Sequence, residues 1–213
     1  MYETKKSLRT LSGIFILLEM GISIILTTVF GYLPMFTRWK ELSPDQFESY
    51  LKSFLVTSSR DWVIWLLMFV TAIFILGRKF PAAGILQAIS ALISFVFSII
   101  SFVSLSRIAS SINIFTWLNT IVGVVSILAT IFFAIALFVK GRSGKLFCIL
   151  SAIIGIITTL LSSAFSLLIS GGISISQFAV VYGGALIGEV IPMILLFLAK
   201  IFLGTYFKAN ENQ

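Results

Sequence analysis

Long apolar stretches recur along the whole chain, and they constrain its fold more than any other feature. A bilayer core needs about 20 apolar residues per helix, and six stretches reach or approach that length. The 213 residues are 59% hydrophobic and 11% charged, whereas soluble domains carry about 25% charged residues. We therefore expect an all-α, polytopic transmembrane helix bundle that forms a single domain, residues 1–213. The predicted helices are about 11–33, 62–76, 82–105, 117–139, 146–169 and 178–199.

The first apolar stretch follows Lys5, Lys6 and Arg9, as the core of a signal peptide would. It is longer than a signal core of about 7 to 15 residues, and no small-residue cleavage site ends it. We interpret it as an uncleaved first helix.

The charges at the helix ends predict the orientation. Loops rich in Lys and Arg lie in the cytoplasm. With the amino terminus inside, ten of the fifteen cations are cytoplasmic, and all four tryptophans lie on the outer side, near the interface that indole rings prefer. We expect a plasma-membrane protein with both termini cytoplasmic, and the Ile, Phe and Ser bias without histidine favours a bacterial one. The predicted cytoplasmic cations are Lys5, Lys6, Arg9, Arg78, Lys79, Lys140, Arg142, Lys145, Lys200 and Lys208.

The outer loop 34–61 is long enough to carry its own structure. Ser43, Pro44 and Gln46 supply a helix cap, a proline at the first helical position and a capping-box partner. Apolar residues follow at helical spacing, which predicts a short amphipathic helix lying in the membrane interface. A lid over an outward-facing cavity and a docking surface for a partner are the alternatives. The apolar positions are Phe47, Tyr50, Leu51, Phe54 and Leu55.

A shift of 64 residues aligns the second and third helices with the fourth and fifth. Between 65–98 and 129–162, eleven of thirty-four positions are identical. Each copy carries small or polar residues at spacing four, three, four, which keeps one helix face and suits close interhelical packing. The pattern indicates either a duplicated hairpin, as in the parallel repeats of some transporters, or convergent transmembrane patterning. The predicted packing residues are Gln87, Ala91, Ser94 and Ser98, then Ser151, Gly155, Thr158 and Ser162.

The sequence lacks the residues of most soluble-enzyme sites. It has no histidine, and its one cysteine, Cys148, lies in an apolar stretch, so it offers no histidine-based metal site or general base and no Cys-His pair. No glycine-rich phosphate loop is present, and the cations are scattered rather than gathered for nucleic acid. We expect no enzyme, metal, cofactor or nucleic-acid partner. The expected partners are the lipid bilayer and either a membrane protein or a second copy of the chain.

Two acidic residues, Glu19 and Glu189, lie within predicted helices. A carboxylate at mid-helix costs about 2.5 to 3.5 kcal/mol, so each is a functional-site candidate, the alternative being a protonated or hydrogen-bonded packing residue. Glu19 is nearer a helix end, where snorkelling or pairing with a neighbouring lysine is easier. Pro192 deprives the carbonyl of Gly188 of its helical donor, which favours a polar pocket beside Glu189. The predicted substrate or proton site is Glu189, Glu19, Pro192 and Tyr182, with Gly184 and Gly188 as a close-packing pair.

Two classes of function remain open from the sequence. The first is binding or transport of a small solute through a mid-membrane site near Glu189. The second is a non-transporting accessory, assembly or immunity protein that acts by packing against a partner. In size, helix count and inside termini the chain is similar to the substrate-binding components of energy-coupling-factor vitamin transporters. Because Gly13, Leu17 and Gly21 stand where those components carry two alanines spaced by four, the resemblance concerns architecture alone and assigns no family.

Overall fold

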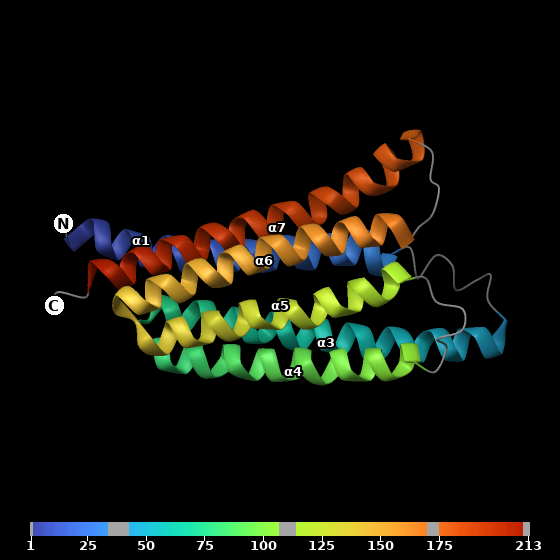
Figure 1. The fold of residues 1–213 in the computed structure, drawn as a ribbon, viewed down its shortest axis with the longest axis horizontal. Coiled ribbons are helices and arrows are strands. Elements are labelled where there is room, and N and C mark those ends of the chain that lie inside the picture. Colours follow the sequence, from blue (N-terminus) through green and yellow to red (C-terminus); the bar gives the residue numbers. More distant parts are fainter. Residues whose placement is uncertain (1, 34–42, 107–113, 170–174, 211–213) are drawn as a thin grey trace.

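The computed structural model describes residues 2–33, 43–106, 114–169 and 175–210. All the secondary-structure elements of the described residues are helices, and the long helices lie side by side in one bundle (Figure 1). The elements are α1 (Tyr2–Leu26), continued by the π-helix η1 (Thr27–Tyr32), then α3 (Pro44–Leu76), α4 (Phe80–Ser106), α5 (Ile114–Val139), α6 (Gly141–Ile169) and α7 (Ile175–Ala209).

Each long helix contains a segment that is long and apolar enough to cross a bilayer. The predicted fold class is therefore confirmed, and the protein is a multi-pass membrane protein whose apolar helices contact lipid. Within the described residues the six candidate spans are Lys6–Val29, Ser58–Leu76, Phe80–Ile100, Ile114–Val139, Gly141–Phe165 and Val190–Ala209.

The six helices form a closed ring. Each helix packs against the next along the chain, and α1 packs against α7, which closes the ring. Because successive helices run in opposite directions, both chain ends lie at the same end of the bundle as the α3–α4 and α5–α6 turns (left in Figure 1). We call this the termini end. The interior of the bundle is consequently surrounded by all six helices.

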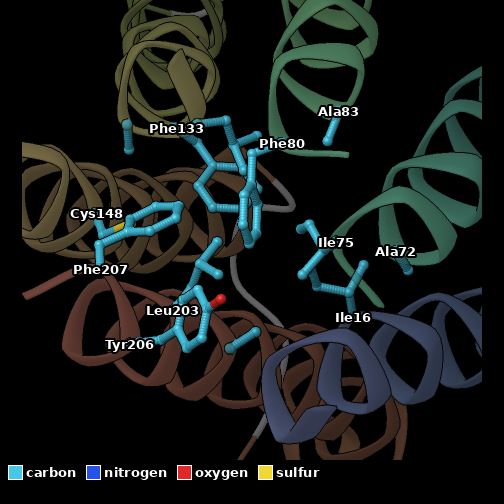
Figure 2. Close-up of a cluster of buried hydrophobic side chains, with 13 residues drawn as sticks. Ile16, Ala72, Ile75, Phe80, Ala83, Phe133, Cys148, Leu203, Tyr206 and Phe207 are labelled. Carbon is cyan, nitrogen blue, oxygen red and sulfur yellow. The ribbon is translucent and has the colours of Figure 1, made fainter. Parts of the chain in front are cut away.

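A cluster of buried apolar side chains fills the ring toward the termini end (Figure 2). The Phe80 ring packs against two rings of α7, 5.7 Å from that of Tyr206 and 5.1 Å from that of Phe207. Alanines on α3, α4, α5 and α7 are fully buried, which lets the helix backbones come close. In lipid, where apolar surface has no water to avoid, such van der Waals packing is a main source of helix association. The alanines are Ala72, Ala83, Ala136 and Ala199.

The predicted amphipathic helix is the first part of α3. The helix begins at Pro44, and the amide of Phe47 donates to the carbonyl of Ser43, 2.8 Å away. No glycine or proline follows until Gly77, so the helix continues into the span instead of ending in the loop. Most side chains of this first part lie outside the described residues, and its amphipathic character stays a prediction.

The last helix is longer than the sequence predicted. It continues past Ala199 to Ala209 and places Lys200 within the span Val190–Ala209. Counting Lys200 among the cations at a helix end was therefore wrong. Nothing that follows Lys200 breaks the helix, because Gly204 is tolerated in a helix interior.

Two tight turns connect helices at the termini end. Arg78 follows α3 with φ 60°, and Lys140 and Gly141 join α5 to α6 with φ 54° and 55°. Glycine adopts this left-handed conformation without steric cost, whereas Arg78 and Lys140 each adopt it at a cost of about 1 kcal/mol. The turns bring basic residues of both hairpins to the termini end.

Candidate functional site

Lys200 is a charged side chain buried in the middle of the bundle. It is 5% exposed, and its Nζ lies 5.4 Å from the centre of the Phe133 ring in α5. A cation at this distance from an aromatic ring is attracted to its face. Gly155 of α6 lies close to the ammonium group, since a Cβ at that position would be in ordinary van der Waals contact with Nζ, at 3.9 Å. The charge thus reaches from α7 into the space between α5 and α6.

Glu19 is a second charged residue in the interior, on α1. It is 9% exposed, and its Oε1 accepts a hydrogen bond from the Ser23 hydroxyl at 3.1 Å. Its Oε2 has no hydrogen-bond partner among the described residues. Glu19 and Lys200 attract each other across the α1–α7 interface, although no direct ion pair between them is described. The lysine that attracts Glu19 is therefore Lys200, which follows it by about 180 residues in the sequence.

A partly enclosed cavity of about 120 Å³ lies beside Lys200, with walls from α1, α3, α4, α5 and α7. We call it the central cavity. On α4 its wall includes Ser90, ten residues after Phe80, which is about 15 Å along the helix and near the middle of a hydrocarbon core about 30 Å thick. The polar lining residues are Gln87, Ser90, Ser94, Thr130 and Lys200, and the apolar ones are Ile16, Ile64, Met68, Phe133 and Leu196.

The central cavity is closed toward the termini end by the buried apolar cluster. Ile16 and Phe133 belong to both, so the cluster begins where the cavity ends. On the α4 wall, Gln87 is held by a hydrogen bond from its Nε2 to the Thr71 hydroxyl of α3, at 3.1 Å, and both side chains are buried. The central cavity is thus a polar space at mid-membrane depth, and the aromatic side chains of the apolar cluster separate it from the termini end.

The first predicted packing stripe lies on α4 and faces the interior at its start. Gln87 and Ala91 are buried, and Ser94 is half-buried and lines the central cavity with Gln87. Ser98 donates its hydroxyl to the carbonyl of Ser94 within the same helix, 2.9 Å away. The stripe therefore supplies both a contact to α3 and part of the cavity wall.

The second predicted packing stripe lies on α6. Ser151 is buried and donates to the Ala129 carbonyl of α5, as Gln87 bonds to the helix before its own. Ser162 donates to Oδ1 of Asn119 in α5 at 2.7 Å. Between them lie Gly155, beside Lys200, and Thr158, whose hydroxyl returns to the Ile154 carbonyl at 2.8 Å. The residues at the head of the two stripes, Gln87 and Ser151, thus both bond to the helix before their own, although their acceptors are not at equivalent positions.

The predicted site around Glu189 falls in the first half of α7. The side chains of Glu189, Tyr182, Gly184 and Gly188 lie outside the described residues, so this site stays a prediction. Pro192 is buried, and the helix passes through it without ending. Glu189 precedes Lys200 by eleven residues, or about 16 Å of helix, so the two belong to different levels of the membrane.

One face of α1 carries a polar stripe that was not predicted from the sequence. Arg9, Ser12, Ile16, Glu19 and Ser23 follow one another at spacing three or four and share one face, and Arg9 and Ser12 are buried. Arg9 Nε and Ser12 Oγ, like Glu19 Oε2, have no hydrogen-bond partner among the described residues. The spacing of these polar residues within an apolar helix could have identified the face. No comparable pattern marked Lys200, because a lysine after an apolar run usually ends a span.

Within the described residues, no group of three carboxylate or thiol side chains could hold a metal ion. The chemistry available at the central cavity is instead that of one ammonium group, an amide and three hydroxyls. In comparisons with known proteins, no family model, no curated protein and no solved structure matches this chain.

Proposed function

We propose that this protein binds or moves a small, negatively charged solute at the central cavity, with Lys200 as its electrostatic partner. One observation supports the proposal above all others: a buried ammonium group lines a mid-membrane cavity together with side chains that donate hydrogen bonds. Ionisable residues inside a membrane are costly, and they mark solute or ion pathways more often than other features do.

The donor groups of the cavity suit an anion. The ammonium group of Lys200 has three donors and no acceptor, and the hydroxyls of Ser90, Ser94 and Thr130 line the same space. A bond from a charged donor to a charged acceptor is about twice as strong as a neutral one. A cavity of about 150 Å³ admits one benzene molecule, and the central cavity, at about 120 Å³, is somewhat smaller. We therefore infer a solute of few non-hydrogen atoms, such as a small carboxylate or an inorganic anion.

Glu19 opposes the binding of an anion, which Lys200 favours. Without a solute, its carboxylate compensates the buried charge of Lys200 through their attraction across the α1–α7 interface. An entering anion competes with Glu19 for the same ammonium group and brings a second negative charge into a medium of low dielectric constant. Removing the charge of Glu19 should therefore strengthen anion binding, whereas removing that of Lys200 should abolish it.

This proposal takes the first of the two classes of function that the sequence left open but moves its centre from Glu189 to Lys200. It also keeps the predicted orientation, with both chain ends in the cytoplasm. The turns and chain ends gathered at the termini end support that orientation, because they carry most of the cations outside the interior.

The test is a thermal-stability titration of the purified protein in a mild detergent with formate, acetate, nitrate, glycine and guanidinium as probes. At a hundred times its dissociation constant, a bound probe stabilises the folded protein by about 2.7 kcal/mol. One or more anions should stabilise wild type, stabilise Glu19→Gln at lower concentration and leave Lys200→Met unaffected. Lys79→Met, a substitution of an exposed lysine at the termini end, is the matched control and should behave as wild type.

Stabilisation by guanidinium alone would contradict the proposal that the solute is an anion. If an anion stabilised Lys200→Met as much as wild type, binding at the central cavity would be contradicted. If no probe stabilises wild type, the solute site is wrong and the accessory or assembly role becomes the leading function. Where an anion does bind, its uptake as a labelled probe into liposomes containing the protein separates transport from binding.

A further inference from the structure

A second polar site lies at the termini end, away from the central cavity. Here a groove of about 430 Å³ runs between the start of α6 and the end of α7, lined by Arg142, Ser143, Lys145, Leu146, Ile149 and Lys208. We call it the basic groove. No carboxylate lines it, and within the described residues none of its three cations forms a salt bridge. In the part of the chain that the structure describes, three positive charges thus face one space without a counter-charge.

Close packing of α6 against α7 sets the positions of these cations. A Cβ at Gly204 of α7 would lie 3.3 Å from the Cα of Lys145, and a Cβ at Gly144 would lie 3.2 Å from a ring carbon of Phe207. Lys208 follows Gly204 by one turn on the same face, which brings it beside Lys145. The two glycines therefore hold cations of two helices at the rim of one groove.

The start of α6 adds to the positive potential. Arg142 and Ser143 lie in its first turn, just after the left-handed Gly141, and both are exposed. The amino-terminal end of a helix carries the equivalent of about half a positive charge and binds anions with its free amides. A guanidinium group, a hydroxyl and this helix end together match the oxygen atoms of a phosphate group.

The other wall of the basic groove is apolar and continues into the membrane. Leu146 and Ile149 line the groove, and Ile153 and Ile157 follow on the same face of α6, at spacing four. Leu146, Ile153 and Ile157 are exposed on the outside of the bundle. The groove therefore joins a cluster of cations to an apolar strip about three turns long, a shape that fits a headgroup followed by an acyl chain.

We propose that the basic groove binds the phosphate headgroup of an anionic phospholipid, with one acyl chain lying along Leu146, Ile149, Ile153 and Ile157. The phosphate accepts hydrogen bonds from Arg142, Lys145 and Lys208, and the apolar strip distinguishes a lipid from free phosphate. Basic pockets between transmembrane helices near a membrane surface bind anionic headgroups in this way. This site is independent of the solute proposed for the central cavity.

The test is native mass spectrometry of the full chain released from a nonionic detergent. Phosphatidylglycerol and phosphatidylcholine with the same acyl chains are added separately, and inorganic phosphate is added in large excess as a competitor. The double variant Arg142→Gln/Lys208→Gln is compared with Lys6→Gln/Lys79→Gln, which removes two exposed cations from the same end of the bundle but outside the groove.

Wild type should bind phosphatidylglycerol more tightly than phosphatidylcholine. The groove variant should weaken that binding by roughly thirtyfold, at about fivefold for each cation near an anionic headgroup, and the control should stay close to wild type. The charge-retaining variant Arg142→Lys/Lys208→Arg should restore it. Equal losses in the groove and control variants would overturn the proposal, because the attraction would then belong to the whole surface. Displacement of the lipid by inorganic phosphate would overturn the choice of a lipid as the ligand.

Discussion

The ammonium group of Lys200 in α7 lies 5.4 Å from the centre of the Phe133 ring in α5. Along the ring of helices α6 stands between these two, so the contact crosses the interior of the bundle. Phe133 also belongs to the buried apolar cluster, and it is therefore the residue at which the packed core and the charged cavity meet.

Replacing Phe133 with leucine should lower the free energy of unfolding by about 1.5 to 3 kcal/mol. Ring packing and an attraction to the cation of about 0.5 to 2 kcal/mol are lost together. In the Lys200→Met background the loss should be smaller by the share of the cation, as measured by denaturation in detergent. Phe95→Leu on the lipid-facing side of α4, where the ring is 46% exposed, should have the same effect in both backgrounds. An undiminished loss for Phe133→Leu in the Lys200→Met background would contradict the contact.

Glu19→Gln and Lys200→Met should be non-additive in stability. Each single change leaves the other buried charge without its electrostatic partner, and the double change removes both, so we expect a coupling energy of about 0.5 to 3 kcal/mol. Thermal melting of wild type, the two single variants and the double variant in one detergent completes this double-mutant cycle. The same cycle built with Lys79→Met in place of Lys200→Met should be additive within about 0.5 kcal/mol.

Gln87→Leu should destabilise the protein by about 1 to 3 kcal/mol, because it leaves the fully buried hydroxyl of Thr71 without its donor. Adding Thr71→Val should recover most of the loss, since an apolar pair of similar shape needs no hydrogen bond. Chemical denaturation of the two single variants and the double variant measures both effects. If the double variant lost as much stability as the two single variants together, the bond would not couple α3 to α4.

Gly204→Ala and Gly123→Ala should change stability in opposite directions. A Cβ at Gly204 would lie 3.0 Å from the Cβ of Cys148 and 3.3 Å from the backbone of Lys145, so α7 must move away from α6, at a cost of about 1 to 3 kcal/mol. A Cβ at Gly123 meets nothing within 4 Å. Alanine there should raise stability by about 0.5 to 1 kcal/mol through its helix propensity. Melting temperatures that fall in both variants would show that α5 is also closely packed at Gly123.

The number of spans could be predicted because apolar length is a local property of the chain. The end of α7 could not, since a lysine after an apolar run has the same local sequence whether it reaches the headgroups or the interior. In the fold Lys200 lies beside the ring of Phe133 and near Gly155, and both residues are on other helices.

The candidate site could be predicted only in part from the sequence, for a similar reason. The charge of Glu19 within an apolar helix identified it from the sequence, and the stripe that begins at Gln87 indicated an inward face. The hydroxyls of Ser90 and Thr130 carry no such mark, because serine and threonine are common on every face of membrane helices. Which helices enclose the cavity depends on the contact of α1 with α7, and no local pattern encodes that contact.

The contact that closes the ring also sets an order of events during synthesis. Glu19 and Lys200 are separated by about 180 residues, so at about 5 to 20 residues per second the ribosome needs roughly 10 to 40 s to make the partner of the first helix. Until then Glu19 of α1 lacks the lysine whose charge attracts its own, and the face of α1 that packs against α7 has no partner. We therefore expect the insertion machinery or a chaperone to shield Glu19 of the nascent first helix, and we expect chains whose translation stops before α7 to be substrates of a protease that surveys the membrane.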